Sequence, residues 1–150
     1  RMYCALANGG TLYEPRLLKE TIGPDGERQP AGPDEEAPRI ELKSATWNAL
    51  KKGLGMTVTS GTAARAFAGF PMSVSGKTGT AQAPPNDSHA WFACWAPSEK
   101  AEIVVVAMLE NGGGGGSSAA PIARDFLDFY YKIGDYAVPE VLPEDLPEGL

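Results

Sequence analysis

Three strand-like segments follow one another in the second half of the chain, and they constrain its fold more than any other feature. They span residues 73–83, 90–96 and 102–109. The middle segment, Ala-Trp-Phe-Ala-Cys-Trp-Ala, is apolar throughout, which predicts a central strand buried on both faces. The last is a β-branched run of strand length. A four-residue link, Pro-Ser-Glu-Lys, joins these two, so we expect them to pair antiparallel.

Helical patterns surround these strands. Residues 1–8 are predicted to form a short helix that ends at Gly9 and Gly10. A second helix is expected over residues 45–54, capped by Ser44, with Gly53 and Gly55 loosening its end. Its apolar positions at helical spacing are Trp47, Leu50 and Leu54.

A third helix is expected over residues 120–133, with apolar residues on one face. Those residues are Ile122, Phe126, Phe129 and Tyr130. Residues 16–23 resemble a strand followed by a Pro-Asp-Gly turn, which favours a hairpin. Together the patterns predict an α/β fold of the α+β type, an antiparallel sheet packed by helices.

Five glycines at residues 112–116 stand between the last strand and the last helix. This is the topology of a phosphate-binding loop, but no Lys-Ser or Lys-Thr pair follows. The favoured interpretation is a flexible link, with Ser117 or Ser118 capping the helix. Residues 1–134 are expected to form part of one domain, and residues 135–150 an acidic, proline-rich tail.

Composition excludes several classes of function. The net charge of −6 and pI of about 4.8 argue against a nucleic-acid partner, which would require a basic surface. Cys4 and Cys94 have no metal-ligand spacing, His89 has no ligating neighbours, and no metal or other cofactor is expected. Cys94 is predicted to be a buried free thiol. No apolar stretch is long enough to cross a membrane, and the opening residues look like the middle of a helix within a longer protein.

The segment with chemical information is residues 75–82, Ser-Gly-Lys-Thr-Gly-Thr-Ala-Gln. In a strand, Thr78 and Thr80 point to one face and Gly79 to the other. Lys-Thr-Gly is one of the elements that mark penicillin-binding proteins and serine β-lactamases. A nucleotide-binding loop would need an earlier glycine at a fixed spacing, which is absent here, and a helix after the motif, so that alternative is disfavoured.

Several blocks in order resemble a class B penicillin-binding protein of the elongation type, penicillin-binding protein 2. The resemblance covers about residues 1–133, the C-terminal part of a transpeptidase domain. Besides residues 75–82, the blocks are Ala-Leu-Ala-Asn-Gly-Gly-Thr-Leu-Tyr at 5–13, Gly-Thr-Ala at 61–63, residues 89–97, and Val-Ala-Met-Leu-Glu-Asn-Gly-Gly at 106–113.

The resemblance implies a serine D,D-transpeptidase that crosslinks peptidoglycan stem peptides and is acylated by β-lactams. It implies catalytic roles for Lys77 and Thr80 and substrate binding by Lys77, Thr78, Gly79 and Thr80. Lys77 would place positive charge near the serine and the substrate carboxylate. The hydroxyls of Thr78 and Thr80 would donate to that carboxylate, and the Thr80 N–H would form half of the oxyanion hole.

One departure from the family is large. No Ser-x-x-Lys or Ser-x-Asn element occurs in these 150 residues. The nucleophile is therefore expected in another segment, and this chain alone is predicted to be inactive. The resemblance also implies the outer face of the inner membrane as location, an anchor outside this segment, and the cell-elongation machinery as partner.

Two further expectations follow. The strand at 103–109 should expose an apolar edge and face, so a partner is expected to complete the sheet, either the missing half of the domain or a second copy. Other functions for the same fold stay open, namely a non-catalytic β-lactam sensor or scaffold module and a β-lactamase.

Overall fold

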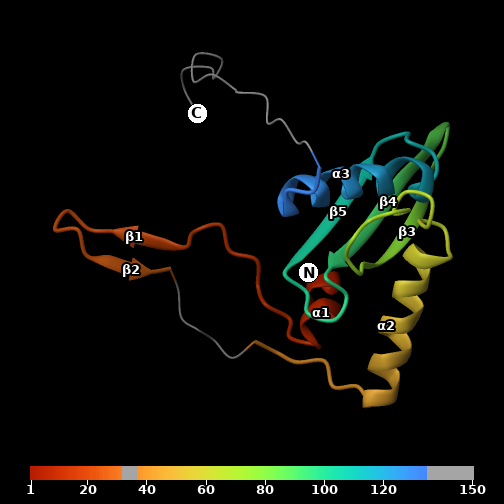
Figure 1. Cartoon of the computed structure of the whole chain (residues 1–150). Helices are drawn as coiled ribbons and strands as arrows, with labels where there is room; N and C mark the ends of the chain where they lie inside the picture. Colours follow the sequence, from red (N-terminus) through yellow and green to blue (C-terminus); the bar gives the residue numbers. More distant parts are fainter. Residues whose placement is uncertain (32–36, 135–150) are drawn as a thin grey trace.

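A three-stranded antiparallel sheet organises the molecule (Figure 1). The computed structural model describes residues 1–31 and 37–134. The sheet contains β3 (Ser75–Ala83), β4 (Asn86–Ala96) and β5 (Ile103–Leu109), in the order β3-β4-β5. Both neighbouring pairs are antiparallel, and β4 lies in the centre. The predicted α+β class, the three strands and their pairing are confirmed.

The core is built on β4, as its apolar sequence predicts. Phe92, Cys94 and Trp95 are each 0% exposed. Burial of a side chain such as Phe contributes about 1.5–3 kcal/mol, so this strand is a major source of stability. Cys94 is a free thiol, and its burial raises its pKa to about 12. The prediction of a buried free cysteine is confirmed, and the thiol is unreactive at neutral pH because the thiolate is the nucleophile.

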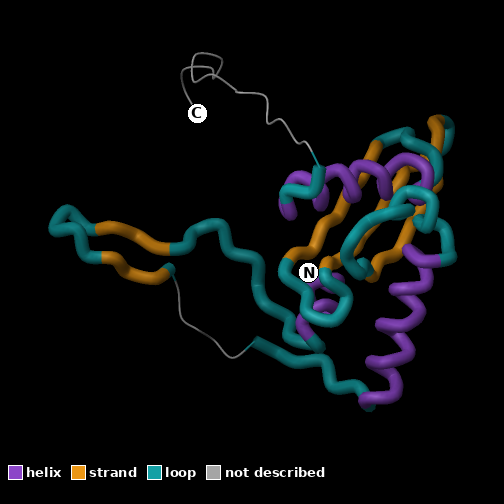
Figure 2. Tube along the Cα trace, in the orientation of Figure 1, coloured by secondary structure: helices purple, strands orange, loops and turns teal. Residues whose placement is uncertain are grey.

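The helices lie around the sheet as Figure 2 shows. They are α1 (Met2–Asn8), α2 (Ser44–Thr59) and α3 (Ala120–Tyr131), and a π-helical turn, η1 (Gly115–Ala119), leads into α3. Helix α1 ends where Gly9 takes the left-handed conformation with φ of 83°, as the two glycines predict. Helix α2 projects from the end of the sheet beside β3 (Figure 1).

Helix α2 differs from its prediction at both ends. It continues to Thr59, so Gly53 and Gly55 lie inside the helix. Ser44 is its first residue and makes no capping hydrogen bond; Lys43 occupies the cap position. The helix tolerates two glycines because its last turns pack on β3, with Val58 buried, and packing outweighs a helix propensity cost of about 1 kcal/mol per glycine.

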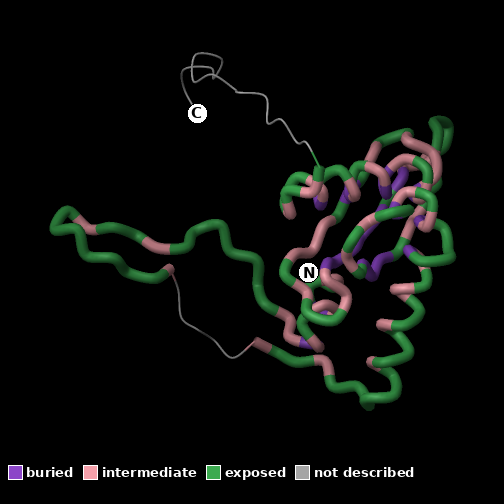
Figure 3. Tube along the Cα trace, in the orientation of Figure 1, coloured by how far each residue is buried: buried purple, intermediate pink, exposed green. Residues whose placement is uncertain are grey.

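The apolar residues expected on one face of α3 are not the ones that form the core. Its buried residues are Ala120, Ala123 and Leu127. Ile122, Phe126, Phe129 and Tyr130 are 44–46% exposed. Figure 3 shows buried segments on the side of α3 toward the sheet and exposed ones away from it. Two small alanines allow the helix to approach the sheet closely, and periodicity alone does not reveal this preference.

The glycine run is not a flexible link, and this prediction was wrong. Gly115 is buried, and it begins the η1 turn. Neither serine caps the helix: Ser117 Oγ donates to the carbonyl of Gly114, within the same turn. The run folds because η1 packs on all three strands of the sheet.

A hairpin extends away from the rest of the molecule (Figure 1). It consists of β1 (Glu20–Ile22) and β2 (Arg28–Pro30), paired antiparallel. The predicted hairpin is confirmed with shorter strands. An ion pair between Arg28 and Glu20 joins the two strands. The predicted tail, residues 135–150, lies outside the described residues.

The outer edge of β5 has no strand beside it in the part of the chain that the structure describes. Val106 is 55% exposed and Met108 44% exposed on this strand. A groove of about 500 Å³ between β5 and α3 is lined by apolar residues, including Ile122 and Phe126. The expected apolar edge and face are therefore present.

We predict that the isolated 150-residue chain self-associates through this edge, because a long apolar strand edge is a template for pairing. Sedimentation velocity should show concentration-dependent association, and Val106→Lys should reduce it by placing a charge on the edge. Lys100→Ala, in the turn before β5, serves as the control. A monodisperse, fully folded monomer at all concentrations would contradict the prediction.

Candidate active site

The four residues of the Lys-Thr-Gly segment lie in the middle of β3, on the free edge of the described sheet. Lys77 and Thr80 are exposed, and Thr78 and Gly79 are half-buried. Gly79 faces Trp91 of β4, and a Cβ built on Gly79 would lie 3.2 Å from the Trp91 Cβ. A side chain at Gly79 would therefore require Trp91 to shift by a few tenths of an ångström.

Lys77 stands beside an open hollow. A cavity of about 390 Å³ is lined by Lys77, Thr78, the C-terminal half of α2 and the turn at residues 60–62. The Lys77 ammonium donates a hydrogen bond to the carbonyl oxygen of Thr78 at 2.6 Å. The positive charge therefore lies beside the strand edge, where a bound anion could reach it.

The position of Gly115 in η1 indicates which backbone N–H and C=O groups of β3 point toward β4 and which point toward the free edge. A Cβ built on Gly115 would lie 2.9 Å from the Gly79 nitrogen and 2.2 Å from the carbonyl oxygen of Trp91, its partner on β4. The Gly79 backbone therefore turns toward β4. Because backbone groups alternate in direction along an antiparallel strand, those of Thr78 and Thr80 turn toward the free edge. There they are available to a ligand.

Thr78 has a partner that was not singled out for chemistry from the sequence. Its hydroxyl lies 2.7 Å from the hydroxyl of Thr62, which is part of the turn between α2 and β3. Thr62 was noted only in the Gly-Thr-Ala block at residues 61–63. The signal available from sequence was this block alone, since the contact joins residues 16 positions apart.

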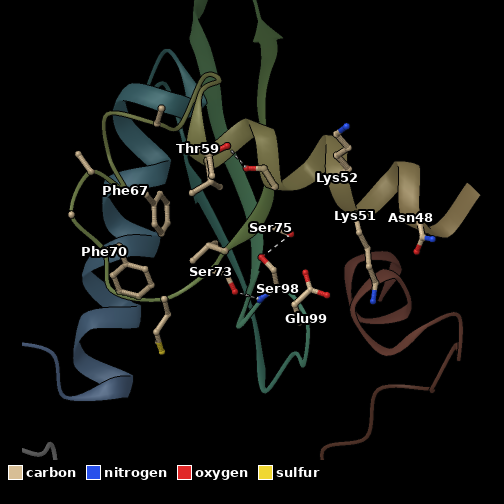
Figure 4. Close-up of a pocket in the computed structure, with 17 residues that line it drawn as sticks. Asn48, Lys51, Lys52, Thr59, Phe67, Phe70, Ser73, Ser75, Ser98 and Glu99 are labelled. Carbon is tan, nitrogen blue, oxygen red and sulfur yellow. Dashed lines mark hydrogen bonds between the residues drawn. The ribbon is translucent and has the colours of Figure 1, made fainter. Parts of the chain in front are cut away.

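The start of β3 is held by hydrogen bonds to the β4–β5 turn (Figure 4). Ser75 is 1% exposed and donates to the Ser98 hydroxyl at 2.9 Å. The Ser98 N–H donates to the Ser73 hydroxyl, and the Trp95 indole donates to the Ser98 carbonyl. These bonds fix where β3 begins, two residues before Lys77.

A second cavity, of about 770 Å³, lies on the opposite side of α2 from Lys77. Lys51, Lys52 and Asn48 of α2 line it together with Glu99 (Figure 4). Two lysines and one carboxylate therefore line the same cavity. It lies beside the first residue of β3, Ser75, and away from the Lys-Thr-Gly segment.

Among residues 1–31 and 37–134, no group of three or more His, Cys, Asp or Glu residues lies close enough together to hold a metal ion. Within the same residues, no helix has the length and apolar character needed to cross a membrane. His89 lies half-buried near the start of β4, and its Nδ1 accepts a hydrogen bond from the Asn111 N–H.

Comparison with known families identifies the fold. Residues 1–128 match the penicillin binding protein transpeptidase domain. The chain belongs to the penicillin-binding protein transpeptidase family. The predicted resemblance is therefore confirmed, and the nucleotide-binding alternative is excluded, since β3 continues as a strand to Ala83 where a phosphate loop would begin a helix.

Individual relatives agree with this family. The chain is 34% identical to the peptidoglycan D,D-transpeptidase MrdA of Haemophilus influenzae over 95% of its own length. It superposes on penicillin-binding protein 2 of Pseudomonas aeruginosa, solved in complex with WCK 5153, with a TM-score of 0.76, 34% identity and coverage of 92% of this chain. A chain of a peptidoglycan synthase complex gives a TM-score of 0.73 at 32% identity over 93% of this chain.

The chain spans only part of these proteins. It covers 25% of the length of MrdA, 32% of the Pseudomonas structure and 24% of the synthase chain. The fold of a transpeptidase domain is thus shown for this chain, while the remainder of each relative lies beyond what the chain matches.

We predict that Thr62→Val slows acylation of the full-length protein by a fluorescent penicillin about fivefold, because one hydrogen bond that orients Thr78 is lost. Thr62→Ser should retain the wild-type rate. Thr59→Val is the matched control, since the Thr59 hydroxyl bonds only to the Gly55 carbonyl of its own helix in this structure. Equal rates for Thr62→Val and wild type would remove Thr62 from the site.

Proposed function

We propose that this chain provides the substrate-binding strand of a peptidoglycan D,D-transpeptidase that crosslinks stem peptides through a serine acyl-enzyme and is acylated by β-lactams. The observation that carries the proposal is the exposed Lys77 ammonium on a free strand edge, beside a hollow, in a chain of this family. The 34% identity to a protein named peptidoglycan D,D-transpeptidase supports the same activity.

The open edge of β3 suits an extended peptide. An extended ligand adds to such an edge through main-chain hydrogen bonds, and the Thr78 and Thr80 backbone groups face outward. The Thr78 and Thr80 hydroxyls would donate to the carboxylate of the stem peptide or of the β-lactam. Lys77 would add a charge-assisted interaction with the same group and with the nucleophile.

The Thr80 N–H is proposed as one donor of the oxyanion hole. A backbone donor aimed at the developing oxyanion lowers the barrier by about 3–4 kcal/mol when the site excludes water. Its direction is set by strand geometry, so it requires no reorganisation during the reaction. Thr80 therefore acts through its backbone in catalysis and through its hydroxyl in binding.

The serine nucleophile and its base are proposed to come from a segment outside these 150 residues, because the sequence has no Ser-x-x-Lys element. This chain alone would then bind weakly and acylate nothing. The same missing segment, or a second copy of the chain, would cover the apolar edge of β5. Both expectations concern the complete protein.

We also propose that the complete protein works at the outer face of the inner membrane, with its anchor outside this chain, as part of the cell-elongation machinery. Two relatives support a role in peptidoglycan synthesis: one is named a peptidoglycan D,D-transpeptidase, and another comes from a structure of a peptidoglycan synthase complex. A nucleic-acid partner is not expected, because the chain carries a net charge of −6.

The decisive experiment is Lys77→Ala in the full-length protein. Acylation by a fluorescent penicillin should slow by about 100-fold or more, as expected when a charged group that assists proton transfer is removed. Lys52→Ala, an exposed lysine on the other side of α2, should label at the wild-type rate. Unchanged labelling of Lys77→Ala would remove Lys77 from the mechanism.

Assays of the products separate the remaining alternatives. A transpeptidase forms crosslinked peptide from stem-peptide donors, a β-lactamase releases hydrolysed antibiotic rapidly, and a sensor or scaffold does neither. Crosslinking activity in the full-length protein, lost in Lys77→Ala, is the expected result.

A further inference from the structure

The second half of the glycine run packs directly against the backbone of the Lys-Thr-Gly strand. The η1 turn lies across β3, β4 and β5, and Gly115 is buried within it. A Cβ on Gly115 would lie 2.4 Å from the Gly79 carbonyl oxygen and 2.2 Å from that of Trp91. Side chains do not approach backbone atoms this closely, so only glycine fits at this position.

Gly116 makes an equally close contact with the turn before β3. Its Cβ would lie 2.1 Å from the carbonyl oxygen of Thr62 and 3.6 Å from the Thr78 Cγ2. Thr62 is thus held between Gly116 on its backbone side and Thr78 on its hydroxyl side. Neither Gly115 nor Gly116 has a positive φ, so close approach, and not backbone conformation, requires glycine here.

The start of the loop is fixed as well. The Gly113 N–H donates to the Ser88 carbonyl at 2.8 Å, and the Asn111 N–H donates to His89 at 3.0 Å. These bonds attach the loop to the first half of β4. The loop therefore has little freedom to move away from β3, and a bulkier residue at Gly115 must displace the strand itself.

We propose that Gly115 and Gly116 are positioning residues for the active-site strand. Gly115 supports Gly79 from behind, which sets the position of the neighbouring Thr80 N–H at the free edge. Gly116 supports Thr62, which sets the Thr78 hydroxyl. The inference rests on the proposed transpeptidase function and adds to it the element that holds the β3 edge in register with the reacting groups.

The size of the effect follows from the contact distances. To reach ordinary van der Waals contact of about 3.4 Å, a Cβ at 2.2 Å from the Trp91 oxygen must move by roughly 1 Å. A misplacement of about 1 Å in an active site can reduce the rate about 100-fold. Helix propensity alone predicts the opposite, since alanine is favoured over glycine in helical turns.

The test uses the full-length protein with Gly115→Ala, Gly116→Ala and the control Gly55→Ala. Gly55 lies inside α2, and its added Cβ would make an ordinary 3.8 Å contact with Ser75. The rate constant of acylation and the dissociation constant of the preceding complex are measured separately with a fluorescent penicillin, on the fraction of protein that is folded and titratable.

We expect the acylation rate constant to fall about 100-fold in Gly115→Ala, with a smaller change in the dissociation constant and a wild-type rate for Gly55→Ala. A merely structural role would lower the melting temperature and the folded fraction, but folded molecules would acylate at the wild-type rate. That result overturns the proposal.

Two further measurements cover the remaining cases. If the alanine variants do not fold, Ala119→Gly replaces them. This substitution loosens η1 because it removes a buried methyl group and introduces no clash, and it should slow acylation a few-fold. If the wild type is not acylated, the proposed function fails, yet hydrogen exchange still tests the support: the Gly79 amide, which turns toward β4, should exchange faster in Ala119→Gly. Wild-type acylation rates together with wild-type amide exchange in Ala119→Gly would contradict the inference.

Discussion

Burial of residues 92–96 of β4 on both faces is the constraint on which the rest of the structure depends. Phe92, Cys94 and Trp95 lose all contact with solvent only when β3 and β5 pair on either side and the η1–α3 segment covers one face. That requirement sets the strand order, and it leaves β3 at the edge of the described sheet. The strand with the chemically informative residues is therefore the one whose backbone is free to meet a ligand.

An edge strand has a cost, because its position is held from one side only. Here the opposing supports come from three separate places. Ser98 fixes the start of β3, Thr62 meets the middle through its hydroxyl, and the glycines of η1 press on the backbone behind Gly79. The candidate site thus combines an open edge with a rear face held by these contacts, the preorganisation that the proposed acyl-transfer chemistry would require.

Other surfaces of the chain are apolar and open. The edge of β5, its groove with α3 and the aromatic side of α3 expose residues that a single folded unit would normally bury. Helix α2 has hollows on both of its sides. The chain matches about a quarter to a third of the length of its relatives, and these surfaces are where the proposed remainder of the domain would pack.

The sequence by itself determined the strands, their antiparallel pairing, the burial of Cys94 and the family, because each depends on residues close together in the chain. It also identified Lys77, Thr78, Gly79 and Thr80 as the candidate site. Only the tertiary structure decided which side of α3 forms the core, that the glycine run is packed and not flexible, and that Thr62 meets Thr78. Those features depend on contacts between distant residues and on how closely two backbones approach, which local periodicity does not encode.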